Sequence, residues 1–261
     1  MTISFYIMSK VFTDEVKRAV DNVYSYVDEI IVVLHDDTNA QKKARSYDPN
    51  DKIKIYQKKF TYFADMRNHA LNHTTGDWIT WLDSDEIFSP FFLQNIKALA
   101  NQSKYDGYKI HRLHFYKTKY EVEDPFSHLR LFKKKKGLRY VGMVHELLTG
   151  LRCIKLLKSR KYEVWHFNNY KYMKANNQKY RAILEKELEF ARKLNDRKLI
   201  ELAKFRIWSN RNIDCVDYFY NPAKMKEVQK EFKQRLKEVL GDKKHYHNLL
   251  VKLEKAHEMS S

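Results

Sequence analysis

Apolar residues in the first half of the chain follow two alternating patterns. Near-continuous apolar runs predict strands buried on both faces of a sheet, at residues 3–8, 29–34, 52–56 and 78–82. Between these runs, apolar residues recur every three or four positions and predict helices at residues 14–26, 64–72 and 89–100. Because strands and helices alternate, we expect an α/β fold with a mixed, mostly parallel sheet joined by crossover helices.

The pattern changes twice in the second half of the chain. Residues 105–167 contain short extended runs, the clearest of them at 107–116 and 162–167. From about residue 171, helical spacing predicts helices at residues 174–194, 196–212, 222–240 and 243–259. We therefore expect an α/β domain over residues 1–170 and a C-terminal helical region over residues 171–261.

The composition indicates a folded protein with a basic surface. Hydrophobic residues make up 43% of the chain and aromatic residues 14%, which excludes a generally disordered chain. The 50 lysine and arginine residues outnumber the 33 acidic residues and leave a formal net charge of +17. This charge suits nucleic acid, an anionic membrane surface or a phosphorylated substrate as partner, and it equally suits a solvated basic surface.

Cysteines and apolar segments limit the expected cellular setting. The two cysteines, Cys153 and Cys215, have no paired spacing, so the sequence predicts neither a disulfide framework nor a cysteine-based zinc site. Residues 1–10 lack the basic leader and cleavage site of a signal peptide, and no apolar stretch is long enough to span a bilayer. We expect a cytoplasmic protein whose contact with a membrane is at most peripheral.

Acidic residues are concentrated where the fourth predicted strand ends. Residues 78–82 are apolar, and carboxylates follow at Asp83, Asp85 and Glu86. Ligands of open α/β sheets bind beyond the carboxyl ends of the strands, and carboxylates there are costly to desolvate unless a cation neutralises them. Since side chains two positions apart on an extended segment point to opposite sides, Asp83 and Asp85 should contact different parts of one ligand. The pattern predicts a divalent cation.

An arginine on the preceding helix is the second feature. Helical spacing gathers four residues on its inward face: Ala64, Arg67, Asn68 and Leu71. A buried guanidinium needs an anion, which a phosphate group or an ordinary ion pair with Asp65 or Asp83 would supply. Asp36 and Asp37 follow the second strand, so carboxylates and an arginine are expected at one edge of the sheet. This arrangement suits a nucleotide diphosphate.

The order of these elements resembles family 2 glycosyltransferases of the GT-A fold. The similarity comprises an aspartate after the second strand, Phe-x-x-x-Arg-Asn-x-Ala-Leu at 63–71, and Gly-Asp-Trp-Ile-x-Trp-Leu-Asp-x-Asp-Glu at 76–86. It extends over roughly residues 1–185, through Gly-x-Val-His-Glu at 142–146 and the histidine at 166. The Asp-x-Asp motif of this family binds a divalent metal and the sugar nucleotide. The resemblance implies a metal-dependent, inverting transfer from a nucleotide-sugar donor, with Mn²⁺ or Mg²⁺, to a glycan, protein or lipid acceptor.

The resemblance also implies roles for individual residues. The donor would be bound by Asp36, Asp65, Arg67, Asn68 and Asp83, and the metal by Asp83, Asp85 and His166. Asp36 would contact the base, although the loop at 35–39 departs from the usual family pattern. His166 follows an apolar run and could instead be a satisfied core histidine.

A carboxylate is also needed to take the proton of the acceptor hydroxyl. The Glu-Asp pair that marks this base in many relatives is matched only loosely, by Glu123 and Asp124. Glu146 is therefore the predicted base, with Glu86 and Asp124 in reserve, and its alternative role is that of a structural partner for a neighbouring histidine or arginine. His111 and His114 are expected in an acceptor groove or on the surface.

Two other classes of function are compatible with parts of the sequence. A basic nucleic-acid-binding protein would explain the charge, but no known binding module is present and such a protein needs no carboxylates at strand ends. A metal-dependent nuclease or nucleotidyltransferase would explain Asp83 and Asp85, but not the helix with Arg67 and Asn68. The sequence favours the glycosyltransferase.

Overall fold

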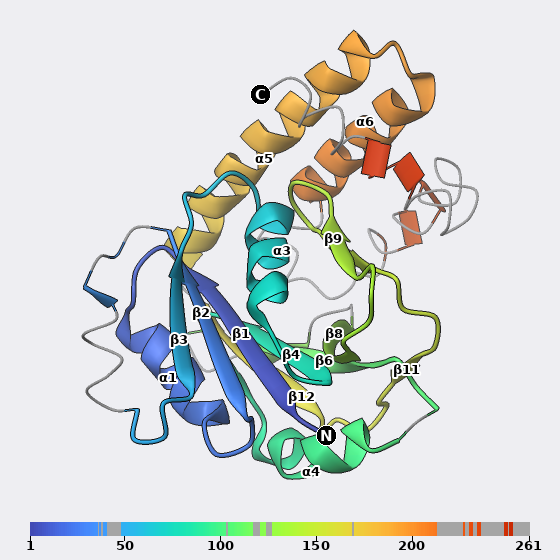
Figure 1. The fold of residues 1–261 in the computed structure, drawn as a ribbon. Helices are drawn as coiled ribbons and strands as arrows, with labels where there is room; N and C mark the ends of the chain where they lie inside the picture. Colours follow the sequence, from blue (N-terminus) through green and yellow to red (C-terminus); the bar gives the residue numbers. More distant parts are fainter. Residues whose placement is uncertain are drawn as a thin grey trace. The chain divides into compact units, whose positions relative to one another are not determined.

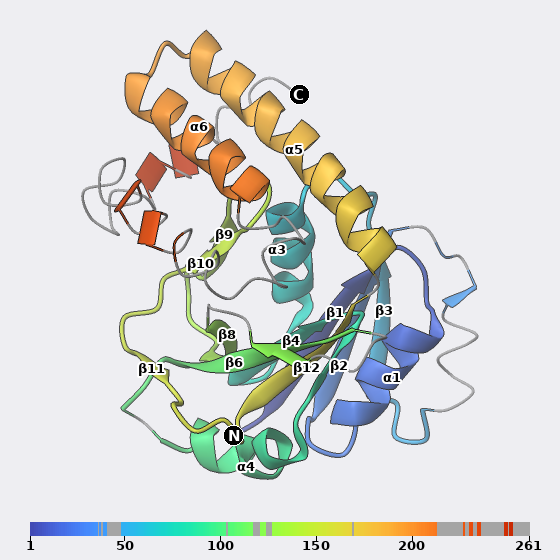
Figure 2. The ribbon, with the colours of Figure 1, turned by 180° about the vertical axis from the view of Figure 1, so that it is seen from behind.

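A computed structural model describes the chain as two compact units (Figure 1, Figure 2). The described residues are 1–35, 37, 39–40, 48–102, 104–116, 121–123, 127–168, 170–212 and scattered positions between 227 and 252. The first unit comprises Met1–Thr61, Asp65–Arg139 and Gly150–Asn168, and the second comprises Tyr62–Ala64, Tyr140–Thr149 and Asn169–Ser261. The expected division at residue 170 stays a prediction.

A mixed sheet forms the centre of the first unit. Its main path follows the order β3-β2-β1-β4-β8-β6-β12-β5, and β7 and β11 pair with β6 at its side. The strands of the main path are β1 (Ile3–Ser9), β2 (Glu29–Leu34), β3 (Ile53–Gln57), β4 (Trp78–Asp83), β5 (Glu86–Phe88), β6 (Gly107–Tyr116), β8 (His128–Lys133) and β12 (Glu163–Asn168). The side strands are β7 (Glu121–Glu123) and β11 (Ile154–Leu156).

The strand directions gather the predicted site at one edge. The strands β3, β2, β1 and β4 are parallel to their neighbours, whereas β8 runs antiparallel between β4 and β6. The carboxyl ends of the four parallel strands therefore meet at one edge. There, the backbone N–H of Phe12 donates to Oδ2 of Asp37 at 2.9 Å, and the side chain of Gln57 donates to the carbonyl of Asp37. The expected mixed, mostly parallel sheet is confirmed.

Helix starts in the first unit follow the sequence signals. Helix α1 (Asp14–Val23) begins after Thr13, whose side chain accepts from the N–H of Val16 at 3.3 Å. Helix α4 (Pro90–Ala100) begins as expected after Ser89, whose hydroxyl accepts from the N–H of Phe92 at 3.3 Å. Helix α3 (Phe63–His73) carries the predicted arginine. These starts fix which helix faces turn inward.

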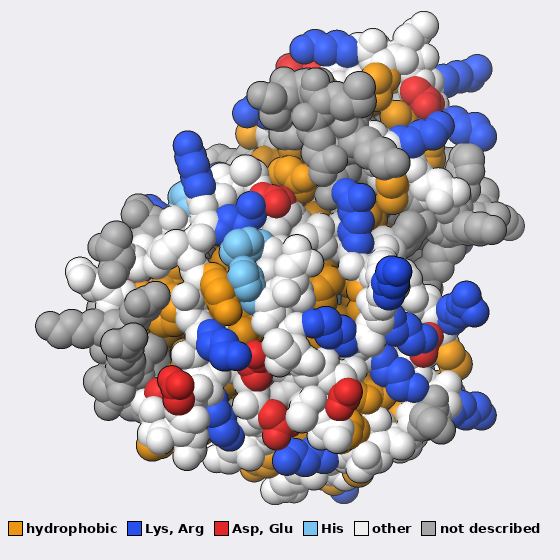
Figure 3. All heavy atoms as spheres, in the orientation of Figure 1, with side chains coloured by type: hydrophobic (Ala, Val, Ile, Leu, Met, Phe, Trp, Pro, Cys, Tyr) orange, Lys and Arg blue, Asp and Glu red, His pale blue; other side chains and the backbone are white. Residues whose placement is uncertain are grey.

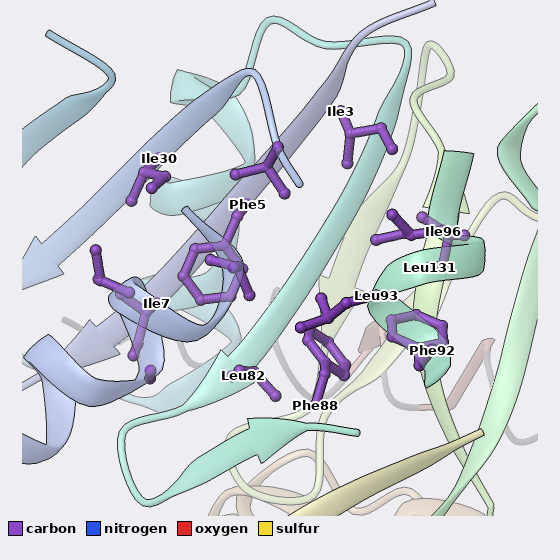
Figure 4. Packing of buried hydrophobic residues seen from close by; sticks show 14 of the residues in the cluster. Ile3, Phe5, Ile7, Ile30, Leu82, Phe88, Phe92, Leu93, Ile96 and Leu131 are labelled. Carbon is purple, nitrogen blue, oxygen red and sulfur yellow. The ribbon is translucent and has the colours of Figure 1, made fainter. Parts of the chain in front are cut away.

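The core of the first unit forms between the sheet and helices α1 and α4. Figure 4 shows apolar side chains from strands and helices converging, among them Ile3, Phe5, Ile7, Ile30, Leu82, Phe88, Phe92, Leu93, Ile96 and Leu131. Alternate residues of β1 share one face of the sheet. Burying each large apolar side chain contributes about 1.5–3 kcal/mol before the entropy cost. This core holds β4 and its carboxyl end in place.

The second unit combines two helices with a short ribbon. Helices α5 (Tyr170–Lys193) and α6 (Arg197–Asn212) pack together, and β9 (Arg139–Val141) pairs with β10 (Leu147–Thr149). Val144, between the two ribbon strands, packs with Leu184 of α5 and Ile207 of α6. The helices expected at 174–194 and 196–212 are confirmed, and those expected at 222–240 and 243–259 lie largely outside the described residues.

Two strands near the predicted site were not foreseen. Strand β5 follows β4 after a turn at Ser84 and Asp85, so the expected extended segment through Asp85 is wrong. Strand β8 inserts between β4 and β6, a pairing that depends on residues far along the chain. The lysine run at 133–136 ends β8 and leads into a turn.

The surface carries charges of both signs. Figure 3 shows lysine and arginine side chains spread over the drawn face, with acidic side chains among them. In the part of the chain that the structure describes, no helix combines the length and apolar character needed to cross a membrane.

Candidate active site

The carboxyl end of β4 places Asp83 against the arginine of α3. Asp83 is the last residue of β4, and Arg67 faces inward with only 4% of its surface exposed. Nη2 of Arg67 donates to Oδ1 of Asp83 at 3.0 Å. The inward position of Arg67 is confirmed, and Asp83 is one of the two ion-pair partners expected for it. The pair places a carboxylate and a guanidinium together at the end of a central strand.

Trp81 is flanked by two guanidinium groups. Cζ of Arg67 lies 3.7 Å from the ring centre, and Cζ of Arg130 on β8 lies 3.8 Å from it. Two groups this close to one ring centre cannot share a face, so the indole lies between them. Nη1 of Arg130 also donates to the carbonyl of Trp81 at 3.2 Å. These cation–π contacts restrict the position of Arg67.

Glu86 joins Arg130 to the backbone of Asp83. Glu86 and Arg130 are both 0% exposed, and Nη2 of Arg130 donates to Oε1 of Glu86 at 2.8 Å. Oε2 of Glu86 accepts from the N–H of Asp83 at 2.9 Å, and Arg112 lies 3.5 Å from Oε1. A carboxylate enclosed in this way is not available to an acceptor hydroxyl. The reserve role of Glu86 as a base is therefore wrong.

Asp85 contacts a different set of side chains. Its Oδ2 lies 3.1 Å from Nε2 of His166 on β12, and Nδ1 of His166 lies 2.9 Å from Nδ1 of His114 on β6. His114 and His166 are register partners on adjacent strands. The two ring nitrogens that face each other require one donor and one acceptor, so each histidine constrains the tautomer of the other. Asp83 and Asp85 thus have separate partners within the protein, and their contact with different parts of one ligand stays a prediction.

The charges around Asp83 keep it ionised. Burial would raise its pKa, but Arg67, Arg130 and Arg112, in that order, outweigh burial and lower the pKa from 3.8 to about 2. The side chain is still 42% exposed, so water screens part of this effect. Because arginines already neutralise Asp83, Asp85 is the carboxylate with more to gain from a metal ion.

Asp85 and His166 fit a divalent ion as a pair of ligands. Their oxygen and nitrogen are 3.1 Å apart, and adjacent ligands of an octahedral ion with bonds of about 2.1 Å are roughly 3.0 Å apart. Among the described residues, no group of three histidine, cysteine or acidic side chains is placed to hold a metal. Mg²⁺ commonly binds through one or two carboxylates and completes its shell with phosphate oxygens and water. The donor set therefore fits an ion shared with a diphosphate.

The other residues predicted to bind the donor are Asp65, Asn68 and Asp36. Oδ2 of Asp65 pairs with Nζ of Lys58 at 2.9 Å and accepts from the hydroxyl of Thr61. Asn68 is half-buried on the same helix. Asp36 and the reserve base Asp124 lie outside the described residues, so their roles stay predictions.

The predicted base Glu146 belongs to the second unit. It follows His145, whose φ of 51° is a left-handed conformation that is uncommon for residues other than glycine. Before it, the N–H of Met143 donates to Glu187 of α5 and the carbonyl of Val144 accepts from Arg206 of α6. The contacts define the backbone on which Glu146 lies, and its role as a base stays a prediction.

One protein family matches the part of the chain that contains most of these residues. The model of a family described as Glycosyl transferase family 2 matches residues 8–150, more than half of the chain. The chain belongs to this family. The prediction that it is a glycosyltransferase is confirmed, and the nucleic-acid-binding and nuclease alternatives are set aside. No curated protein matches the chain.

Three solved structures are similar to this glycosyltransferase to different degrees. S. aureus TarS 1–349 in complex with UDP-GlcNAc is 11% identical with a TM-score of 0.51, over 92% of this chain and 81% of that one. A longer TarS chain is 14% identical with a TM-score of 0.46, over 72% of this chain and 40% of that one. Glucosyl-3-phosphoglycerate synthase from Mycobacterium tuberculosis is 19% identical with a TM-score of 0.34, over 45% and 44%. The TarS 1–349 match confirms the expected GT-A fold.

Two contacts of the site were not foreseen from the sequence, that of Trp81 with Arg130 and that of His114 with His166. Trp81 was assigned only to a buried strand, and Arg130 was not singled out, although a lone arginine between Leu129 and Leu131 is unusual in an apolar strand. The surface position allowed for His114 is wrong, because the side chain is 2% exposed and contacts His166. Both errors arise because the strand that supplies the neighbour is distant in sequence.

Proposed function

We propose that this glycosyltransferase moves a sugar from a UDP-sugar to an acceptor hydroxyl, with a divalent ion and with inversion at the anomeric carbon. The observation that carries the proposal is the separate pairing of Asp85 with His166 and of Asp83 with Arg67. A nucleotide diphosphate needs cations near its phosphates and hydrogen-bond acceptors near its ribose. The two pairs offer both, because Asp83 ends β4 and Asp85 lies in the turn that follows it.

Asp85 and His166 would hold Mg²⁺ or Mn²⁺. When bound, the ion supplies positive charge that offsets the negative charge of the departing diphosphate. His166 would bind through Nε2, which leaves its proton on Nδ1. Nδ1 of His114 lies 2.9 Å away and can accept a hydrogen bond from this N–H group. His114 would therefore orient the metal ligand.

Asp83 and Arg67 would contact the rest of the donor. Asp83 remains ionised because its pKa lies at about 2, so it can accept a hydrogen bond from a ribose hydroxyl. Arg67, held against Trp81, can donate to a phosphate oxygen. From the family resemblance, Asp65 and Asn68 would line the same site and Asp36 would contact the base.

Glu146 would act as the general base. The acceptor oxygen forms a bond to the anomeric carbon while its proton passes to Glu146. The bond from that carbon to the diphosphate oxygen breaks, and its electron pair leaves with UDP. Attack from the face opposite the leaving group gives inversion.

UDP-GlcNAc is the first donor to test, because TarS 1–349, which shares the fold, was solved in complex with it. Glycans, proteins and lipids are the acceptor classes to screen. A cytoplasmic location stays a prediction from the cysteines and apolar segments, and a peripheral contact with an anionic surface stays a prediction from the basic composition.

The deciding experiment combines donor binding with turnover. A thermal-shift panel of UDP-, GDP- and ADP-sugars, with and without Mn²⁺ or Mg²⁺, should show stabilisation by one donor in a metal-dependent manner. Release of UDP from UDP-GlcNAc, with water as the acceptor, measures turnover. Asp85→Ala should lose the metal-dependent shift and slow UDP release by about 100-fold.

The matched control is Asp21→Ala on α1, since Asp21 is exposed and pairs with Lys17 on the same helix. It should behave like the parent protein in both assays. A parent protein that no nucleotide sugar stabilises, or an Asp85→Ala variant with full metal-dependent turnover, would overturn the proposed function.

A further inference from the structure

A buried acidic and basic pair lies beside the segment that carries Glu146. Glu187 of α5 is 1% exposed and Arg206 of α6 is 3% exposed. Nε of Arg206 lies 3.4 Å from Oε2 of Glu187. Both residues lie outside residues 8–150, the part of the chain that matches the family model. The helical region therefore brings two buried charges to a segment within the family match.

The pair contacts the backbone immediately before His145. The N–H of Met143 donates to Oε1 of Glu187 at 3.2 Å, and Nη2 of Arg206 donates to the carbonyl of Val144. On its other side, the carbonyl of Met143 accepts from the N–H of Phe63 at 3.1 Å. Three backbone groups of two consecutive residues are thus fixed by hydrogen bonds.

Packing restricts the same segment. Val144 is buried in a cluster with Leu184 of α5 and Ile207 of α6. At Gly142, whose φ is 99°, an added Cβ would lie 3.4 Å from Nη1 of Arg206, so the guanidinium lies close against the chain. A residue such as His145 keeps an uncommon backbone conformation only when its surroundings over-determine it. These contacts supply that constraint.

The pair is not arranged for stability alone. Among the described side chains, Oε2 of Glu187 and both Nε and Nη1 of Arg206 are buried without a hydrogen-bond partner. Buried ion pairs of this kind are often replaced by apolar side chains without loss of stability. The hydrogen bonds to Met143 and Val144 are what an apolar pair could not provide.

We propose that Glu187 and Arg206 are positioning residues, which fix the backbone of Met143 and Val144 so that Glu146 is presented in the geometry needed to take the acceptor proton. The inference rests on the proposed function of Glu146. A base must come within about 2.6–3.2 Å of the proton it takes. A displacement of about 1 Å by a distant change can slow a reaction roughly 100-fold.

The first test separates positioning from stability. The double variant Glu187→Met with Arg206→Met keeps apolar packing but removes both hydrogen bonds to the segment. UDP release from UDP-GlcNAc with Mn²⁺ should fall about 100-fold at a temperature where both proteins are fully folded, while the thermal shift given by UDP-GlcNAc stays close to the parent value. Glu187→Gln keeps a side-chain oxygen for Met143, so its turnover should be partly rescued, to within about 10-fold of the parent.

The same two helices offer a matched control. Arg211 of α6 and Glu185 of α5 form an exposed pair, with Nη2 and Oε1 4.0 Å apart. The double variant Glu185→Gln with Arg211→Met removes this pair, and it should leave turnover and donor binding within about 2-fold of the parent.

Hydrogen exchange provides a readout that needs no substrate. Amides at 142–147 should exchange at least about 10-fold faster in the double methionine variant than in the parent, because their backbone is no longer fixed by Glu187 and Arg206. Exchange there should be unchanged in the Glu185 and Arg211 control.

The outcomes distinguish this inference from the proposed function. If Glu146→Gln retains full turnover, the proposed base is wrong. If Glu146→Gln is inactive but the double methionine variant turns over like the parent, the positioning role alone is overturned. Unchanged exchange at 142–147 in the double methionine variant would also overturn it, as would a loss of turnover that the melting temperature fully explains.

Discussion

Two buried arginine–glutamate pairs hold the two segments that carry the candidate site residues. In the first unit, Glu86 accepts from the N–H of Asp83, and Arg130 donates to the carbonyl of Trp81. In the second unit, Glu187 and Arg206 make the same two kinds of contact with Met143 and Val144. Both pairs join one backbone N–H and one backbone carbonyl of a segment that ends in a candidate carboxylate.

The two pairs differ in geometry and in origin. The first has a donor–acceptor distance of 2.8 Å, and the second is looser at 3.4 Å. Glu86 lies three residues from the Asp83 whose N–H it accepts, whereas Glu187 lies 44 residues from Met143. The difference indicates that the segment ending in Asp83 is held largely by residues of the sheet, while the segment with Glu146 depends on the C-terminal helices.

Replacing the arginine of each pair should cause the largest loss of stability, and the loss should differ between the two pairs. Arg130→Met leaves the fully buried Glu86 with Arg112 at 3.5 Å, and breaking such a pair costs about 3–5 kcal/mol. Arg206→Met should cost less, about 1–3 kcal/mol. Burial already raises the pKa of Glu187, so this carboxyl can take up a proton when its partner is lost.

Urea unfolding followed by peptide-level hydrogen exchange measures each unit separately. Lys17→Met, which removes an exposed pair with Asp21, serves as the surface control and should be nearly neutral. An equal cost for Arg130→Met and Arg206→Met would remove the distinction between the tight and the loose pair.

Alanine variants of two glycines test the role of the segment with Glu146 with a smaller loss of stability. Gly142 and Gly137 have φ values of 99° and 81°, so an alanine at either position is strained by about 1–2 kcal/mol. An added Cβ at Gly142 would lie 3.4 Å from Nη1 of Arg206, beside the segment with Glu146. An added Cβ at Gly137 would meet no described atom within 4 Å. Both variants should lose similar stability in urea unfolding, but only Gly142→Ala should slow UDP release from UDP-GlcNAc. Equal turnover in the two variants would contradict a special role for the segment at 142–146.

The pH dependence of the two carboxyl groups should show opposite signs. For the half-exposed Asp83, screening by water leaves an effect of about 1 kcal/mol. The pKa of Asp83 in the folded protein is about 2, so its pair with Arg67 stabilises the fold above pH 3.8 and is lost as the pH falls toward 2. Burial raises the pKa of Glu187 above 4.5, despite the opposing effect of Arg206. Its favourable contribution is present below pH 4.5 and is lost as the pH rises through the raised pKa.

Urea titrations between pH 2.5 and 7 check these signs by circular dichroism. Asp83→Asn should be destabilised at neutral pH and should approach the parent as the pH falls below 3.8. Glu187→Gln should gain stability relative to the parent as the pH rises above 4.5. Parallel trends in the two variants would show that the two carboxyl groups are not in the different environments described.

Much of the first unit and part of the site could be predicted from local pattern. Apolar runs identified the parallel strands, and Thr13 and Ser89 begin helices through hydrogen bonds to residues three positions on. Helical spacing placed Arg67 on the inward face, and it lies there with Asp83. Each of these features depends on residues close in sequence, so periodicity and capping rules suffice to find them.

The amino-acid sequence by itself determined the parallel strands and the helix faces, and it predicted Asp83, Asp85 and Arg67 as residues of the site. Only the tertiary structure decided that β8 lies between β4 and β6 and so brings Arg130 to Trp81. It likewise decided that His114 meets His166, 52 residues away, and that α5 and α6 hold the segment before Glu146. Strand order and helix packing minimise the free energy of the whole core, so no local pattern encodes which distant side chains become neighbours.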